Sequence, residues 1–214
     1  MRATKPFTFS AMSRRAAMTA AALAAMATLS GCGGGKAGGV AVGDMALGAA
    51  DGAKVTVVEY ASVTCGHCAA WQQEVWPEFK TKYVDTNKVR YVFREFPTPP
   101  IPVATAGFLM ARCAGEDKYF DIIHEIMASQ PEIFGGTPPR TVLLRIAQGA
   151  GLTEEQFQTC VTDEDAIKAM EARIRAGLDA GVSGTPTFIV NGEKVADSSL
   201  SGLSEKIDAE LAKS

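Results

Sequence analysis

The sequence is poor in metal-binding side chains, because its 214 residues include only two histidines, His67 and His124. It has five cysteines, and Cys65 and Cys68 form its one Cys-x-x-Cys motif. A structural zinc site takes four ligands, usually from two such motifs. The sequence therefore predicts no metal site and no resident cofactor, which favours thiol chemistry for the Cys-x-x-Cys pair over a zinc site or an inert disulfide.

The sequence also lacks an excess of positive charge. Its formal net charge is −3, and residues 1–31 hold four cations and no acids, so their removal changes the charge to −7. An acidic protein does not attract nucleic-acid backbones or anionic lipid by charge. We therefore expect no nucleic-acid partner.

Residues 1–31 have the pattern of an export signal. Four cations precede the apolar run 16–29, which is short for a membrane span. The run leads into Leu29-Ser-Gly-Cys32, which resembles a bacterial lipobox, where cleavage before Cys32 accompanies acylation of its thiol. We expect a periplasmic or otherwise extracytoplasmic protein that is lipid-anchored to a bacterial membrane. An uncleaved anchor and simple secretion are the alternatives.

The rest of the chain alternates between two kinds of pattern. Residues 32–53 are rich in Gly and Ala and predict a flexible tether. Strands are expected at 55–63, 89–94, 187–190 and about 194–195, and helices at 65–79 with a break near Pro77, 103–114, 119–128, 139–150, 153–160, 163–178 and 200–211. This order predicts an α/β fold whose core, 54–98 and 181–214, is split by an all-helical insertion, 99–180.

Cys65 stands between a predicted strand and a predicted helix. The positive end of a helix stabilises a thiolate, so we expect Cys65 to be the exposed nucleophile. Cys68 lies one turn further and is expected to be the resolving thiol. This pair predicts exchange between thiols and disulfides.

Four segments resemble the DsbA family of exported thiol:disulfide oxidoreductases, over roughly residues 50–212. They are Val-Val-Glu-Tyr at 57–60, Cys-Gly-His-Cys at 65–68, Phe-Arg-Glu-Phe-Pro at 93–97 and Gly-Val-Ser-Gly-Thr-Pro-Thr-Phe-Ile-Val-Asn-Gly at 181–192. The resemblance implies a thioredoxin-like fold with an inserted helical subdomain. One difference stands out: the Gly-His dipeptide is similar to that of protein disulfide isomerase, whereas the DsbA family more often has Pro-His.

The resemblance also implies roles for single residues. Glu59 would relay protons to Cys68; otherwise it is a strand-end acid paired with a lysine. His67 would stabilise the Cys65 thiolate or merely occupy the turn. Thr185 and Pro186 would form a cis-proline loop that faces the cysteines and holds an extended substrate, or else a simple turn. We expect His124 to be a helix histidine without a chemical role.

The remaining cysteines, Cys113 and Cys160, lie on separate predicted helices. With Cys32 set aside as the acylated thiol, four cysteines remain. An even number of cysteines in an exported chain implies pairing, and the short spacing of Cys65 and Cys68 leaves the remaining two as partners. We expect a structural disulfide. Two buried free thiols and a regulatory couple are the alternatives.

The pattern as a whole favours a monomeric oxidase that donates its disulfide to reduced exported proteins. The resemblance implies a membrane partner of the DsbB type, linked to quinone, that reoxidises it. An isomerase or reductase is the alternative, although we see no extra N-terminal domain such as dimeric isomerases use. A copper-binding chaperone on the same fold is a third hypothesis, and it needs a further ligand besides the two cysteines.

Overall fold

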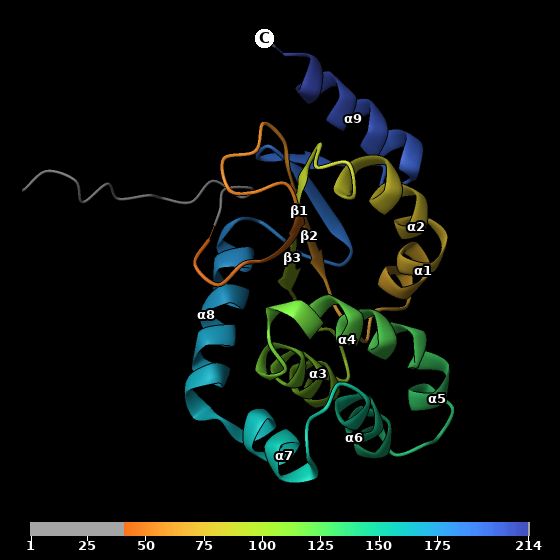
Figure 1. Cartoon of the computed structure of the whole chain (residues 1–214), viewed down its shortest axis with the longest axis vertical. Coiled ribbons are helices and arrows are strands. Elements are labelled where there is room, and N and C mark those ends of the chain that lie inside the picture. Colours follow the sequence, from red (N-terminus) through yellow and green to blue (C-terminus); the bar gives the residue numbers. More distant parts are fainter. Residues whose placement is uncertain (1–40, 214) are drawn as a thin grey trace, which may run out of the picture. The chain divides into compact units, whose positions relative to one another are not determined.

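The computed structural model describes residues 41–213. The export signal, Cys32 and the first part of the predicted tether lie outside the described residues. A mixed five-stranded sheet has the order β1-β3-β2-β4-β5, and helices cover both of its faces (Figure 1). Only β2 and β3 run parallel, and the other neighbours are antiparallel. The strands are β1 (Met45–Gly48), β2 (Thr56–Ala61), β3 (Arg90–Glu95), β4 (Thr187–Val190) and β5 (Glu193–Val195).

Strand β2 is the centre of the core because both of its faces are buried. Val57 packs into the large apolar cluster on the α1 side, whereas Val58 and Tyr60 belong to a second cluster on the other face. A strand covered on both sides reads as a continuous apolar run rather than an alternating one. The predicted strand at 55–63 is therefore confirmed, and Glu59 in its middle is a buried acid.

The helix after β2 is interrupted where the sequence predicted it. Helix α1 (Gly66–Glu74) ends at Val75, and α2 (Trp76–Phe79) restarts with Pro77 in its first turn, followed by a π-helical turn, η1 (Lys80–Val84). Proline fits a first turn because its missing N–H needs no partner there. Trp71, Trp76 and Phe79 remain on one buried face and pack against one another.

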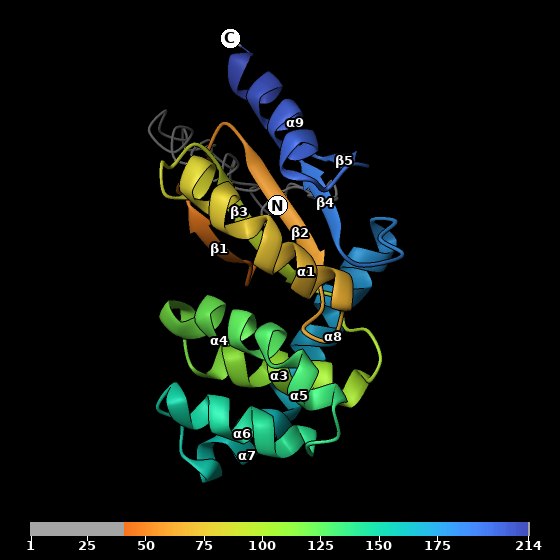
Figure 2. The same ribbon diagram turned by 90° about the vertical axis from the view of Figure 1, so that its right-hand side faces the viewer.

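Six helices lie between β3 and β4 in the chain and form the predicted insertion. They are α3 (Ile101–Cys113), α4 (Glu116–Ala128), α5 (Gln130–Phe134), α6 (Pro139–Gly149), α7 (Glu154–Thr162) and α8 (Glu164–Asp179). Helices α3 to α7 group together below the sheet in Figure 2, while α8 runs back to the core. A Cβ built on Gly177 of α8 would lie 2.9 Å from the Tyr60 ring, so α8 packs closely on β2. Helix α9 (Leu200–Ala212) closes the chain.

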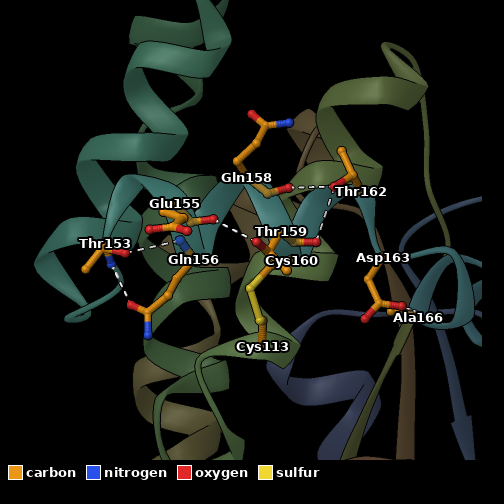
Figure 3. Close-up of a disulfide and its surroundings, with 10 residues drawn as sticks. All are labelled: Cys113, Thr153, Glu155, Gln156, Gln158, Thr159, Cys160, Thr162, Asp163 and Ala166. Atoms are coloured by element: carbon orange, nitrogen blue, oxygen red, sulfur yellow. Dashed lines mark hydrogen bonds between the residues drawn. A yellow bond between two sulfur atoms is a disulfide. The ribbon is translucent and has the colours of Figure 1, made fainter.

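A disulfide joins two helices of the insertion (Figure 3). It links Cys113, the last residue of α3, to Cys160 of α7, with their Cα atoms 5.9 Å apart. The alternative of two buried free thiols is therefore wrong, and Cys113 is in fact exposed. The cross-link closes 47 residues, which the chain-entropy model values at roughly 4 kcal/mol.

One part of the tether prediction is wrong. Met45–Gly48 forms the edge strand β1, which pairs with β3 from Met45 opposite Phe93 to Gly48 opposite Arg90. Asp44, the residue before β1, is also fixed to the sheet, because the Arg94 guanidinium of β3 forms two hydrogen bonds with its carboxylate. These long-range contacts outweigh a composition that by itself favours a flexible chain.

Glu95 at the end of β3 joins the sheet to the insertion. Its carboxylate is fully buried and pairs with Arg112 of α3 and with Arg173 of α8, whose Nε lies 3.0 Å from Oε2. The Tyr119 hydroxyl of α4 also donates to it, at 3.1 Å. Because removing one partner leaves a buried charge unpaired, breaking such a cluster costs about 3–5 kcal/mol. These contacts therefore hold α3, α4 and α8 at the end of β3.

None of the helices within residues 41–213 combines the length and apolar composition needed to cross a membrane.

Candidate active site

Cys65 caps the N-terminus of α1 with its sulfur. Its backbone is extended, with φ −86° and ψ 117°, and its Sγ accepts a hydrogen bond from the backbone N–H of Cys68 at 3.2 Å. The free N–H groups of a first helical turn and the helix dipole both favour negative charge at this place. Both cysteines are free thiols in this structure.

Cys65 is less accessible than expected. We predicted an exposed nucleophile, but only 8% of its surface is exposed, whereas the neighbouring Gly66 and His67 are exposed. The cause is the loop before β4, since the Cys65 thiol donates to the backbone carbonyl of Thr185 at 3.5 Å. A partner must therefore reach the sulfur along the edge formed by this loop.

The pKa of Cys65 is lowered well below its ordinary value, to about 6. The largest cause is the hydrogen bond with the Cys68 side chain, and burial opposes it. Further hydrogen bonds from the Thr185 side chain and the Cys68 backbone lower the pKa, and the positive field of His67 adds to them. The lowered pKa favours the thiolate form of Cys65 in the reduced protein at neutral pH.

Cys68 has the opposite environment. Its side chain is fully buried, and burial raises its pKa far above the ordinary range, helped by the hydrogen bond to Cys65 and by the charge of Glu59. A thiol with a low pKa leaves and attacks as a thiolate, whereas a buried one with a high pKa holds its proton. The two sulfurs therefore differ in chemistry although three positions separate them.

Glu59 is buried in β2 with the Tyr91 hydroxyl of β3 as its hydrogen-bond donor. Burial raises its pKa to about 8; the Tyr91 hydrogen bond opposes this shift, and the charge of Cys65 adds to it. Its observed partner is a tyrosine rather than the lysine of the alternative interpretation. A carboxyl group that titrates near neutral pH and acts electrostatically on Cys68 has the properties required of a proton relay.

The peptide bond between Thr185 and Pro186 is cis, as the resemblance implied. The loop brings the Thr185 carbonyl to Cys65, and β4 begins at Thr187. The backbone ahead of β4 therefore lies beside the reactive sulfur, where an extended substrate can align with it.

A groove of about 510 Å³ opens next to Cys65. Residues of α1, the cis-proline loop and the segment before α9 line it: His67, Ala70, Trp71, Glu74, Val75, Thr185, Pro186, Asp197, Ser198 and Ser199. The Trp71 indole donates to the Ser198 carbonyl at 2.8 Å, which joins two of these walls. His67 thus lines the groove and also acts through its charge on the Cys65 sulfur.

Sequence reasoning missed Gln130, a buried residue at the start of α5. Its Nε2 donates to the carbonyls of Val63, at 2.8 Å, and Cys65, at 3.1 Å. The insertion therefore holds the backbone of the active-site loop directly. The Gln130-Pro131 pair reads only as a helix start, and nothing in the sequence points to a partner 65 residues away.

Sequence reasoning also missed the buried hydroxyls of Ser62 and Thr64, which precede Cys65 in the loop after β2. The Thr64 hydroxyl donates to the Thr98 carbonyl at 2.7 Å, and the Ser62 hydroxyl accepts from the Thr98 backbone at 3.0 Å. These bonds tie the loop before Cys65 to the chain that leaves β3. They satisfy polar groups that burial would otherwise leave unpaired.

His124 lies apart from this chemistry. Its ring packs edge-on against Trp76 at 5.3 Å between centroids, and burial lowers its pKa to about 4. In residues 41–213 no three His, Cys, Asp or Glu side chains come together as a metal site requires. The further ligand that the copper hypothesis needs is therefore not found beside the two cysteines.

Comparison with known proteins gives the family of the chain. A protein-family model described as thioredoxin matches residues 41–209. The chain belongs to the thioredoxin family. A Rickettsia bellii protein described as a protein-disulfide oxidoreductase is 36% identical to this thioredoxin-family chain over 177 residues, which cover 80% of the chain and 66% of the relative. The chain spans between 60% and 66% of the length of the rickettsial relatives.

Solved structures agree on the branch of the family. The crystal structure of Wolbachia pipientis alpha-DsbA1 is 25% identical, with a TM-score of 0.73 over 81% of this chain and 93% of that protein. Oxidised BdbD from Bacillus subtilis, at 19% identity, has the same fold, with a TM-score of 0.74 over 82% and 97% of the two chains. This thioredoxin-family protein has the DsbA-type fold with the inserted helical subdomain.

Proposed function

We propose that the protein is an oxidase that donates a Cys65–Cys68 disulfide to reduced exported proteins. The observation that carries this proposal is the contrast between the two sulfurs, since the pKa of Cys65 is about 6 while that of buried Cys68 is strongly raised. Stabilising the thiolate of the reduced form makes the disulfide easier to reduce. Such a disulfide passes readily to a substrate.

The reaction begins when a substrate thiolate attacks Cys65 Sγ of the oxidised protein. A mixed disulfide forms, the Cys65–Cys68 bond breaks, and the sulfur of Cys68 leaves as a thiolate that takes up a proton. A second substrate thiolate then attacks the substrate sulfur of the mixed disulfide, and Cys65 leaves as a thiolate. Two electrons pass from the substrate to the protein, and the substrate gains one disulfide.

Each neighbouring residue has a part in this sequence. Glu59 delivers the proton that Cys68 takes up and accepts it again when the disulfide is restored, which its pKa of about 8 permits near neutral pH. His67 stabilises the Cys65 thiolate. The Thr185 carbonyl, 3.5 Å from that sulfur, aligns the substrate backbone for attack.

The cellular setting is part of the proposal. The segment ending at Cys32 is an export signal of the lipoprotein type, so the protein works outside the cytoplasm on a lipid anchor, as a monomer. A quinone-linked membrane protein of the DsbB type restores the disulfide after each cycle. Substrates are exported chains with paired free thiols.

The reduction potential tests the preferred direction. Equilibrating the protein in glutathione buffers of graded ratio, with alkylation to count free thiols, is expected to give a potential well above the roughly −270 mV of thioredoxin. A value near that of thioredoxin would contradict the oxidase and favour the reductase. The Cys113→Ala/Cys160→Ala variant, measured in parallel, assigns the potential to the correct pair of cysteines.

Removing the attacked sulfur tests the assignment of roles. Cys65→Ser is expected to abolish disulfide transfer to a reduced protein substrate. Cys68→Ser has no disulfide to donate and is expected to lose transfer as well. When its reduced form is given a substrate that already contains a disulfide, the Cys65 thiolate is expected to attack that disulfide and to accumulate as a mixed disulfide, because the Cys68 thiol that would attack back is gone. Transfer that persists without Cys65 would show that another sulfur is attacked.

A further inference from the structure

The groove beside Cys65 is lined by two acidic side chains and one histidine. Two carboxylates line it, Glu74 from α1 and Asp197 from the segment before α9, and no lysine or arginine is among the lining residues. Both side chains are exposed. Thr185 and Pro186 of the cis-proline loop line the same groove, so the two carboxylates share it with the place where we propose that the substrate aligns.

Neither carboxylate has a counter-ion in the described part of the protein. Within residues 41–213 neither Glu74 nor Asp197 forms an ion pair, whereas Glu95, Glu193 and Glu210 all do. Asp197 accepts a hydrogen bond from the Ser199 backbone at 2.9 Å, which lowers its pKa and keeps it ionised. The charge of the groove is therefore left for a ligand to balance.

Charge in the groove bears directly on the attack. A substrate attacks as a thiolate, so it brings a negative charge towards two carboxylates, which repel it. The repulsion is smaller for a substrate with a cation close to its cysteine. In an extended segment, residues two positions apart point to the same face, so a cation two positions from the cysteine faces the groove when the cysteine faces Cys65.

We propose that Glu74 and Asp197 make this groove select substrate segments that carry a lysine or arginine about two residues from the reacting cysteine. The inference rests on the proposed function and adds a substrate class to it. The partner is an extended, basic segment of a reduced protein. His67 lines the same groove, but its positive charge favours an acidic substrate. The preference for a basic substrate therefore depends on Glu74 and Asp197.

Matched peptides test the inference. The oxidised full-length protein is mixed with reduced two-cysteine peptides that differ only in having Lys, Gln or Glu two positions from one cysteine, and acid-quenched samples give second-order rate constants. The Lys peptide is expected to react roughly three- to tenfold faster than the Glu peptide at low salt. Salt at about 0.5 M is expected to reduce that ratio.

The variants separate selection by the groove from the acidity of the peptide itself, because a nearby lysine also makes the peptide thiol more reactive. The ratio is expected to fall severalfold in Glu74→Gln/Asp197→Asn, which keeps the size and hydrogen-bonding oxygen of each side chain. Glu78→Gln, an exposed acid on α2 that does not line the groove, is expected to keep the wild-type ratio.

Two results would overturn the inference, and they are distinguishable. A Lys-to-Glu ratio that is the same in the wild type and the double variant would overturn the selection by charge while leaving the oxidase intact. A wild type that oxidises none of the peptides, although dithiothreitol reduces its disulfide, would overturn the proposed function and this inference together.

Discussion

The sulfur of Cys65 lies 3.5 Å from the backbone carbonyl of Thr185, a residue 120 positions later in the chain. The reactive end of α1 is therefore completed by a loop from the other half of the core. The two halves are joined in the chain by the whole helical insertion. The site therefore depends on the return of the chain to the sheet after the insertion.

The acidity of Cys65 should depend most on Cys68. Since the hydrogen bond with the Cys68 side chain is the largest cause of the lowered pKa, Cys68→Ala is expected to raise the pKa of Cys65 from about 6. The rate of iodoacetamide alkylation against pH measures it. His67→Gln should produce a smaller rise, because the field of His67 is the weakest of the stated causes. An equal or larger effect of His67→Gln would contradict this ranking.

Glu59 should make the reduced protein less stable as pH rises. Its carboxyl keeps a proton up to about pH 8 in the folded state, whereas in the unfolded state it ionises near 4.5. The free energy of unfolding therefore falls between these values, by on the order of 4 kcal/mol for so large a shift. In Glu59→Gln this slope should be absent in urea titrations from pH 5 to 8. A parallel pH profile would show that Glu59 is already ionised in the fold.

Gln130 should position the active-site loop from the insertion. Gln130→Leu removes both hydrogen bonds to the Val63 and Cys65 carbonyls in a buried place, where an unsatisfied acceptor costs about 1–3 kcal/mol. We expect a lower unfolding midpoint and, more tellingly, a changed pKa of Cys65 in the alkylation assay. The exposed Gln148 of α6 supplies the control, Gln148→Leu, which should alter neither. A stability loss with an unchanged Cys65 pKa would reduce Gln130 to a packing role.

The Cys113–Cys160 disulfide should stabilise the insertion. Replacing both cysteines by alanine is expected to lower the free energy of unfolding by roughly 2–4 kcal/mol, because the unfolded chain gains the freedom of a 47-residue loop. Denaturant unfolding without reductant measures the loss, with Cys65→Ser/Cys68→Ser as the matched control. An unchanged midpoint would favour the regulatory alternative.

His124 should weaken the fold in acid. Burial lowers its pKa to about 4, whereas the unfolded side chain takes up a proton near 6.5. Proton uptake by the unfolded state reduces the free energy of unfolding as pH falls from about 6.5 to 4. The slope should be shallower in His124→Phe, whose ring can keep the contacts with Trp76 and Phe120. Urea unfolding at pH 4.5 and 7 compares the two proteins.

Much of the fold could be predicted because the relevant patterns are local. The apolar run before Cys65, the two short strands at 187–190 and about 194–195, and the break at Pro77 each depend on residues close in sequence, and each matches an observed element. Strand β1 could not be predicted in this way. Met45–Gly48 is a strand because β3 offers an open edge, and that edge is not visible in the four residues themselves.

The same distinction between local patterns and tertiary contacts applies to the active site. Cys65, Cys68 and His67 were predicted from one tetrapeptide, and Pro186 from a resemblance. The low exposure of Cys65 and the role of Gln130 could not be predicted, because they arise where the cis-proline loop and α5 approach the same turn. The local sequence predicts which groups react, whereas tertiary contacts determine how much of each side chain is exposed to solvent.

The buried Glu95 cluster has a consequence for the mobility of the insertion. Tilting the insertion away from β3 would separate the Glu95 carboxylate from the guanidinium groups of Arg112 and Arg173. The cost of breaking these ion pairs opposes a hinge between β3 and the insertion. If the proposed function holds, we expect adaptation to different substrates to come from their flexible segments rather than from movement of the insertion.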